Sequence, residues 1–168
     1  SFEGRGTQES PYMIVTVEQL AFIGRASVLW DRCFVLVSDL DLADVSVLRI
    51  GISEGSGFTG NFDGRGHVIR NMVRRTKESI APVHGLFGYV SRRGRIQNLH
   101  FQNATITGGK NARNLGILAD VNYGNITNCH AYGSVTADAQ SSSLGGLVGK
   151  NRGTIDSCSA AAIVTGGG

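Results

Sequence analysis

The sequence predicts an all-β fold, a right-handed parallel β-helix, in which the chain winds as a solenoid with about 30 residues per coil. Each repeat contains three short apolar or β-branched runs separated by Gly, Asn and Ser, as strands separated by turns are. No run carries apolar residues at helical spacing over about ten residues, which excludes repeats built from helix pairs. One motif occurs three times, as Gly85-Leu86-Phe87-Gly88, Gly116-Ile117-Leu118-Ala119 and Gly146-Leu147-Val148-Gly149.

A second motif predicts the rows of the core. Ile96, Ile126 and Ile155 lie 30 and 29 residues apart and occupy the same place in similar phrases. The segment Val68-Ile69-Arg70-Asn71-Met72 matches these phrases at a spacing of 27 and is interpreted as an earlier rung. We therefore expect two inward stacks, which run in chain order as Ile69, Ile96, Ile126, Ile155 and as Met72, Leu99, Cys129, Cys158.

The first third of the sequence predicts a cap. Thr16-Val17-Glu18-Gln19 is a capping box, in which the Thr16 hydroxyl and the Gln19 side chain satisfy free N–H groups at a helix start. Apolar residues follow, so a short helix is expected. Because the first coil of a β-helix exposes strand edges and core side chains, residues 1–50 are assigned to the N-terminal cap with irregular first coils. Residues 51–168 are assigned to regular coils of the same continuous domain.

Composition excludes several function classes. The net charge of +3 comes without a dense Lys/Arg stripe interleaved with aromatics, so nucleic acid is not expected as a partner. No apolar stretch reaches the roughly 18 residues that a membrane span needs. Cys33, Cys129 and Cys158 form no C-x-x-C pair, so no zinc site is expected. Stacking brings Cys129 and Cys158 within disulfide range, although buried free thiols are the preferred interpretation.

The repeats resemble the GLUG motif of bacterial secreted and surface β-helix proteins, which is named for its Gly-Leu-x-Gly core. Two of the three copies quoted above have this core, and the copy that begins at Gly116 is degenerate. Residues 4–14, 36–42 and 58–69 also look like segments that commonly precede such repeats. The resemblance implies a β-helix and an extracellular or cell-surface location. It implies no catalytic residues, because the family carries no fixed catalytic set.

A polysaccharide lyase or hydrolase would need carboxylates that converge on one glycosidic bond. From residue 79 onward, the acidic residues are Asp120, Asp138 and Asp156. The repeat alignment pairs Asp120 with Lys150 as a ladder ion pair, and it places no second carboxylate beside Asp156. We therefore expect no catalytic residue and no enzyme, and we keep a polysaccharide-degrading enzyme as an alternative.

Two further groups are candidates for metal ions. Asp39 and Asp41 share one strand face, which makes calcium the one cofactor considered, but solvated polar positions explain them equally well. His100 and His130 are expected to stack outward on adjacent rungs. The third rung offers Ser159, which leaves too few ligands for a transition metal. No metal site and no cofactor are expected.

Arg93, Tyr123 and Arg152 align at one turn corner and form the candidate binding surface, with Arg92, Arg95 and Lys150 close by. An aromatic ring flanked by guanidinium groups suits sugars or anionic polymers through stacking and cation–π contact. A row of solvated turn residues is the alternative. The corner makes a carbohydrate-binding module, with surface glycans as partners, the second functional hypothesis.

The main hypothesis is a non-catalytic structural or adhesive module outside the cell. The last rung closes at Ile163-Val164-Thr165 without a capping helix, so its backbone groups are expected to be covered by further repeats of a longer chain or by another copy. Residues 1–7 are expected to extend as an added strand on such a copy. End-to-end stacking would then build a fibre.

Overall fold

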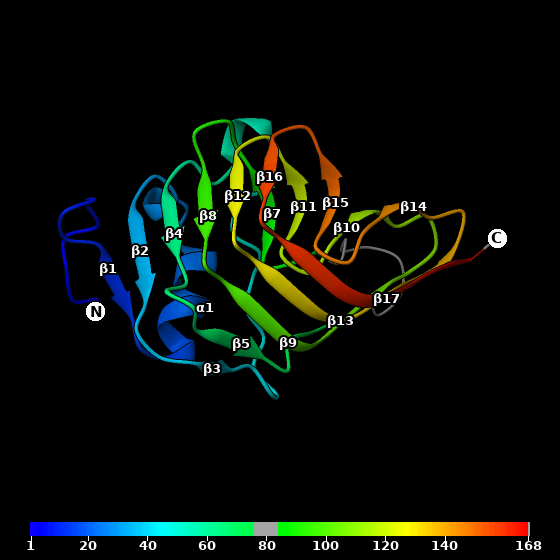
Figure 1. Cartoon of the computed structure of the whole chain (residues 1–168), viewed down its shortest axis with the longest axis horizontal. Coiled ribbons are helices and arrows are strands. Elements are labelled where there is room, and N and C mark those ends of the chain that lie inside the picture. Colours follow the sequence, from blue (N-terminus) through cyan, green and yellow to red (C-terminus); the bar gives the residue numbers. More distant parts are fainter. Residues whose placement is uncertain (76–83, 168) are drawn as a thin grey trace.

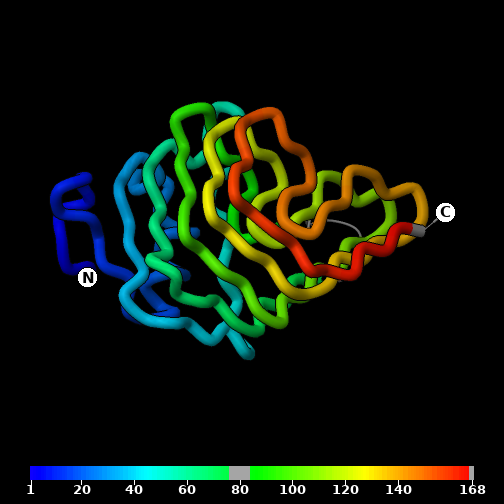
Figure 2. The backbone as a smooth tube through the Cα atoms, in the orientation of Figure 1, coloured from blue at the N-terminus to red at the C-terminus, as the bar shows by residue number. Residues whose placement is uncertain are grey.

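The computed structural model describes residues 1–75 and 84–167. Parallel strands stacked on their counterparts in neighbouring coils form a β-solenoid of about four turns. The coils follow one another from the N-terminal to the C-terminal end of the long axis (Figure 1). The path of the backbone through these coils is clearest in Figure 2. The predicted parallel β-helix with a short N-terminal helix is confirmed.

Sheet A runs through every coil and crosses residue 50 without a break. Its strands are β1 (Tyr12–Ile14), β2 (Cys33–Leu36), β4 (Asn61–Asp63), β8 (Arg95–Gln97), β12 (Asn125–Thr127) and β16 (Thr154–Asp156). Sheet B contains β3 (Leu40–Asp41), β5 (Val68–Arg70), β9 (His100–Gly108), β13 (His130–Ala139) and β17 (Ser159–Gly167), with β6 (Val73–Arg75) paired to β9.

Two smaller sheets close the coils. Sheet C contains β7 (Phe87–Val90), β11 (Ala119–Asn122) and β15 (Val148–Asn151), and sheet D contains β10 (Arg113–Leu115) and β14 (Ser142–Leu144). Two 3₁₀ turns, η1 (Ser27–Leu29) and η2 (Glu54–Ser56), lie in the first coils. Every strand pair named here is parallel, because each strand bonds to the strand at the same place in the next coil.

Three isoleucines form a row in sheet A. Ile96 pairs with Ile126, and Ile126 pairs with Ile155. Ile96 and Ile126 are fully buried, whereas Ile155 in the last coil is 37% exposed. Cys129 and Cys158 likewise precede paired residues of β13 and β17, which places them at equivalent positions. The inward rows therefore continue to the end of the described chain, and the last coil leaves them uncovered.

The expectation that Ile69 precedes Ile96 in this row is wrong. Phe62 pairs with Ile96 in sheet A, and Ile69 pairs with Phe101 in sheet B. Met72 follows Ile69 to the sheet B face of the coil, where its carbonyl accepts the N–H of Thr105. Both residues therefore belong to rows other than the expected ones.

The physical reason is that asparagine stands at two different corners of the solenoid, one after the strands of sheet A and one within sheet B. Asn71, Asn98 and Asn128 each directly follow a strand, with φ of 58°, 54° and 50°. Asn103 lies within β9 and has φ of 51°. Asparagine tolerates this left-handed conformation better than most residues. The amide of Asn103 donates to Asn71 (2.7 Å), and that of Asn128 donates to Asn98 (2.8 Å). The two asparagine ladders give different corners the same local sequence.

The N-terminal end is closed by α1 (Val17–Arg25). Its predicted capping box is present: Thr16 accepts the N–H of Gln19, and the Gln19 side chain accepts the Thr16 N–H. Leu20 and Ile23 are fully buried in the core, and the Trp30 indole donates to the Ile23 carbonyl (2.8 Å). Among the described residues, no helix has the length and apolar character to cross a membrane.

The first residues are not free to extend, which corrects the expectation for residues 1–7. Met13 donates its N–H to the Glu3 carbonyl (2.9 Å) in an antiparallel bridge along the outer edge of β1. The Gln19 amide donates to the Ser1 carbonyl (2.9 Å). The ring of Phe2 lies 5.2 Å from that of Tyr12. The segment folds back because its apolar ring and its backbone groups find partners on the cap.

The repeated glycines follow from close packing of successive turns. A Cβ atom on Gly85 would lie 2.3 Å from the Gly116 carbonyl oxygen, and one on Gly116 would lie 2.7 Å from the Leu147 carbonyl oxygen. No side chain fits there without moving the backbone. The motif that starts at each of these glycines therefore marks the place where one coil touches the next.

Candidate functional site

The corner that follows sheet C brings together Tyr123 and Arg152. The Tyr123 N–H donates to the Val90 carbonyl (2.8 Å), and the Arg152 N–H donates to the Asn122 carbonyl (2.7 Å). Tyr123 and Arg152 therefore occupy equivalent positions in successive coils, and Ser91 takes this position in the coil before them.

Arg93 shares this corner but lies outside that row. A turn closed by the Gly94 N–H and the Ser91 carbonyl (2.8 Å) carries Arg92 and Arg93 at its tip. In the next coil the connection is shorter and is closed by the side chain of Asn122, which accepts a backbone N–H. The longer turn lifts both arginines outward, and both are exposed.

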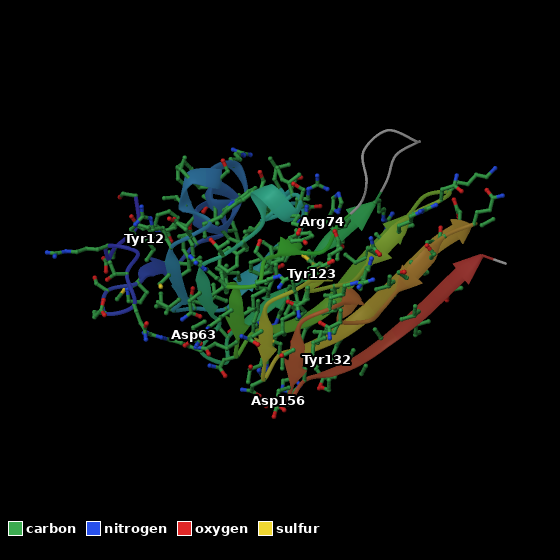
Figure 3. The ribbon with its side chains drawn as sticks, turned by 90° about the horizontal axis from the view of Figure 1, so that it is seen from above. Tyr12, Asp63, Arg74, Tyr123, Tyr132 and Asp156 are labelled. Atoms are coloured by element: carbon green, nitrogen blue, oxygen red, sulfur yellow. The ribbon has the colours of Figure 1, made fainter. Side chains whose placement is uncertain are left out.

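Two adjoining hollows lie at this corner. Arg92, Tyr123 and Arg152 line the first, which has a volume of about 600 Å³. The second has a volume of about 280 Å³ and extends toward η2. Its lining residues are Glu54, Thr59, Tyr89, Ser91, Arg92, Arg93 and Tyr123. We call Tyr89, Arg92, Arg93, Tyr123 and Arg152 the arginine–tyrosine corner. In Figure 3, Tyr123 lies well apart from Asp156.

Two tyrosine rings form the base of the corner. The rings of Tyr89 and Tyr123 stack with centroids 5.4 Å apart and planes 20° apart. Tyr89 is held from the other side, because Gly57 is so close that a Cβ atom there would lie 2.7 Å from the Tyr89 ring. Burial raises the pKa of Tyr89, and the charge of Glu54 adds to this shift. The Tyr89 phenol is therefore neutral at physiological pH.

The charge at the corner is mostly unneutralised. Within the described ranges, no carboxylate forms an ion pair with Arg92, Arg93 or Arg152. Glu54 is the one acidic residue among those that line the two hollows. Lys150 lies in β15, two residues before Arg152, and its side chain is exposed. The arrangement can bind anionic groups through the guanidiniums and sugar or other flat faces through the rings.

Sequence reasoning missed Tyr89 and Glu54. Tyr89 alternates outward with the buried Val90, so strand period alone could have placed it on the face of Tyr123. Arg92 was expected close to this corner, and it lines both hollows. Glu54 comes from a non-repeating segment and left no spacing signal.

The expected ladder pair of Asp120 with Lys150 is wrong. Lys150 pairs with Val121, so the strands are shifted by one residue from the expected alignment. Such a shift turns a side chain to the opposite face of the sheet. Asp120 is 3% exposed, accepts the Gly85 N–H (2.9 Å) and contacts His84 Nδ1. Burial raises the pKa of Asp120, and the histidine opposes this shift.

The three candidate carboxylates lie on three sheets. Asp120 belongs to β11 in sheet C, Asp138 to β13 in sheet B and Asp156 to β16 in sheet A. Asp156 is exposed and accepts a hydrogen bond from the neighbouring Ser157 (3.3 Å). A pair of carboxylates acting on one bond needs both groups on the same face. These three do not meet that condition.

Asp39 and Asp41 are bound by protein donors. Asp39 accepts the Val68 N–H (2.9 Å) and pairs with Arg70 (3.1 Å), and the Val68 bond is the main cause of its lowered pKa. Asp41 accepts the side chain of Asn71 (2.8 Å). Calcium would have to displace these donors. In the part of the chain that the structure describes, no group of three or more His, Cys, Asp or Glu side chains could hold a metal ion.

His100 and His130 stack as expected, with ring centroids 4.9 Å apart in an edge-to-face arrangement. His130 Nδ1 lies 2.7 Å from the Ser159 hydroxyl and its Nε2 lies 3.2 Å from the Asn128 amide oxygen. Burial lowers the pKa of His100, and the neighbouring His130 adds to this shift. The pair is thus a polar ladder along sheet B.

The three cysteines are free thiols. Cys129 donates its N–H to the Cys158 sulfur (3.3 Å), so the two side chains follow one another in adjacent coils. Burial raises the pKa of Cys129 to about 12. This thiol therefore acts as a small apolar core group and not as a nucleophile or metal ligand.

Residues 140–165, which include the third copy of the glycine motif, match the model of the GLUG motif. The resemblance to GLUG-motif proteins is confirmed. The matched segment covers β14, β15, β16 and most of β17, so one GLUG repeat spans parts of all four sheets.

Two larger proteins are similar to this GLUG chain. Halomucin of Haloquadratum walsbyi is 31% identical over 150 residues, which cover 82% of this chain and 2% of halomucin. A solved structure from Bacteroides ovatus, named as a proposed immunoglobulin A1 protease, aligns with a TM-score of 0.64 and 24% identity. That alignment covers 95% of this chain and 49% of the other, and it shows likeness of fold alone.

Proposed function

We propose that this chain is a non-catalytic structural segment of a protein outside the cell, where it forms a rigid rod that holds binding surfaces. The observation that carries this proposal is the continuous stacking of sheet A from β1 to β16. Stacked coils with buried rows resist bending because each strand is bonded to both neighbours. The GLUG motif and the similarity to halomucin support the extracellular setting.

The positions of the acidic residues support a non-catalytic role. Asp120, Asp138 and Asp156 lie on three different sheets, and Asp120 is bound by its neighbours inside the solenoid. To test this, we would incubate the chain with pectate, alginate, glycosaminoglycans and immunoglobulin, with and without calcium, and measure product release. We expect none above buffer. Turnover that disappears in Asp120→Asn or Asp156→Asn would overturn the proposal and favour the enzyme alternative.

We further propose that the last coil accepts a coil of a second copy, which would build an end-to-end stack. Ile155 and Val164 continue the buried rows of Ile126 and Val135 but are 37% and 43% exposed. In the described part of the chain, no strand pairs with the outer edges of β14 to β17. An uncovered edge of this kind favours strand addition.

Light scattering over a range of concentrations tests the stacking. The parent chain is expected to self-associate, and Val164→Lys is expected to stay monomeric because a charge would be buried in the contact. Tyr132→Lys is the matched control, since Tyr132 is 47% exposed in β13, which lies between β9 and β17 and away from both ends. A parent chain that stays monomeric at high concentration would contradict the stacking. The rod proposal is tested separately, by the resistance of the chain to proteolysis.

A further inference from the structure

The cations of the arginine–tyrosine corner converge from two coils. Arg92 comes from the turn after β7, and Arg152 follows β15, yet both line the same hollow with Tyr123. Arg32 and Arg70 have carboxylate partners in Asp31 and Asp39, whereas no carboxylate of the described residues pairs with Arg92 or Arg152. Of the residues that the structure describes, those that line the first hollow include no acidic side chain. A group that enters it meets two guanidiniums whose positive charge is not compensated.

The aromatic part of the corner is pre-organised. Tyr123 is half-buried and stacks on Tyr89, which is itself held against Gly57. A ring fixed in this way loses little conformational entropy when it binds a ligand. Sugar rings present C–H faces that pack on aromatic side chains, and their hydroxyls accept the hydrogen bonds that tyrosine and arginine donate.

The shape of the corner suits a chain rather than a single small molecule. The two hollows share Arg92 and Tyr123 and extend from η2 to Arg152, which is the direction of coil stacking. A linear polymer that lies along the corner could therefore contact several cations one after another, with Lys150 near the Arg152 end. Neutral sugars would leave the guanidiniums without anionic partners. Nucleic acid would favour a longer run of cations than these four.

We propose that the arginine–tyrosine corner binds an acidic polysaccharide, with its carboxylate or sulfate groups on Arg92 and Arg152 and a sugar ring against Tyr123. The shared chemistry is an anion-bearing sugar chain. Arg93 and Lys150 extend the contact at its two ends. This binding is independent of the proposed rod function, because it needs one folded chain and no catalysis.

Calorimetry with four probes tests the proposal: a sulfated glycosaminoglycan, a polyuronate, neutral dextran and duplex DNA. The glycosaminoglycan and the polyuronate are expected to bind the parent chain more tightly than dextran and DNA do. The ratio of their two dissociation constants identifies the preferred anion. The double variant Arg92→Gln/Arg152→Gln is expected to bind roughly tenfold more weakly, since each exposed ion pair contributes about threefold. Tyr123→Ala is expected to lose about fivefold.

Matched controls separate the site from general effects. Arg113→Gln removes a cation from exposed β10, and Tyr132→Ala removes a half-exposed tyrosine from β13, so both should bind as the parent does. The arginine variants alter exposed side chains, so their thermal unfolding should match that of the parent. The proposal is overturned if neither acidic polysaccharide binds, if dextran or DNA binds as tightly, or if the double variant binds as well as the parent.

Discussion

The two ends of this solenoid are built differently from the same kind of coil. At the N-terminal end, α1 and the segment before β1 cover the first coil. The buried rings of Phe34 and Phe62 contact each other in successive coils, and those of Phe58 and Phe62 contact Phe87. At the C-terminal end the same rows continue, but the side chains that fill them are smaller and partly exposed. One row of sheet B runs in chain order through Leu40, Ile69, Phe101, Ala131 and Ala160.

This difference shows that stability in a solenoid depends on position as well as on residue type. A residue buried between two coils loses contacts on both sides when it is truncated, whereas a residue in the last coil has a neighbour on one side. The covered end also contributes the large apolar areas that aromatic rings bury. Residues in the covered or central coils and their counterparts in the last coil should therefore respond differently to substitution.

The largest effect is expected at the centre of the isoleucine row. Ile126 is fully buried between Ile96 and Ile155, so Ile126→Ala should lower the free energy of unfolding by about 2–5 kcal/mol. Ile155 is 37% exposed, and Ile155→Ala should cost about 1 kcal/mol. Denaturant unfolding of both variants measures the difference. Equal losses, or a loss below about 1 kcal/mol at Ile126, would show that the row is misassigned.

The next effect is kinetic and concerns two cysteines at equivalent positions. Burial raises the pKa of Cys129 from 9.0 to about 12, which leaves about a thousandfold less thiolate than an ordinary thiol has. Cys158 is half-buried in the last coil. An alkylating reagent at pH 8 should therefore modify Cys158 well before Cys129, as peptide mass spectrometry would measure. Both should react alike in denaturant, and comparable rates in the folded chain would contradict the burial of Cys129.

A smaller effect is expected from the capping box. Thr16 accepts the Gln19 N–H at the start of α1, and Thr16→Ala should lower the free energy of unfolding by about 1 kcal/mol. Thr165 is exposed in β17, so Thr165→Ala at the open end should change it by less than about 0.5 kcal/mol. Thermal or denaturant unfolding distinguishes the two. A Thr16 variant as stable as the parent would mean that the cap is held by packing alone.

The smallest effect depends on pH. The Val68 N–H, with His67 and Arg70, lowers the pKa of Asp39, so its contribution is present above the ordinary pKa of aspartate, near about 4. Because Asp39 is exposed, Asp39→Asn should cost about 0.5 kcal/mol at pH 7. The cost should vanish as the pH falls through the lowered pKa. Asp156→Asn in the last coil is the control and should be neutral. If Asp39→Asn still lowered the free energy of unfolding at low pH, the loss would come from packing and not from the charge of Asp39.

The regular coils were predictable from the sequence, because a residue in one coil faces the residue about 30 positions later. This spacing placed Ile96, Ile126 and Ile155 in one row and brought Tyr123 and Arg152 to one corner. The capping box predicted α1, since its signal is local and does not depend on tertiary contacts.

The failures have physical causes. Ile69 was placed in the wrong row because Asn71 and Asn98 end different strands in the same left-handed conformation. The alignment of Asp120 slipped by one residue because the interval between coils changes from 30 to 29 within the motif, as the pairing of Ala119 with Val148 shows. Glu54 comes from a segment without repeats, where spacing carries no information.

The position of the phenylalanine-rich coils also bears on the order in which the chain folds. The N-terminal end leaves the ribosome first, and it holds α1 and the aromatic contacts, for example that between Phe34 and Phe62. Each later coil can then fold on a coil that is already formed, which allows the chain to gain structure in the order of its synthesis. The partners of each strand in sheets A to D come from the coil before it and the coil directly after it.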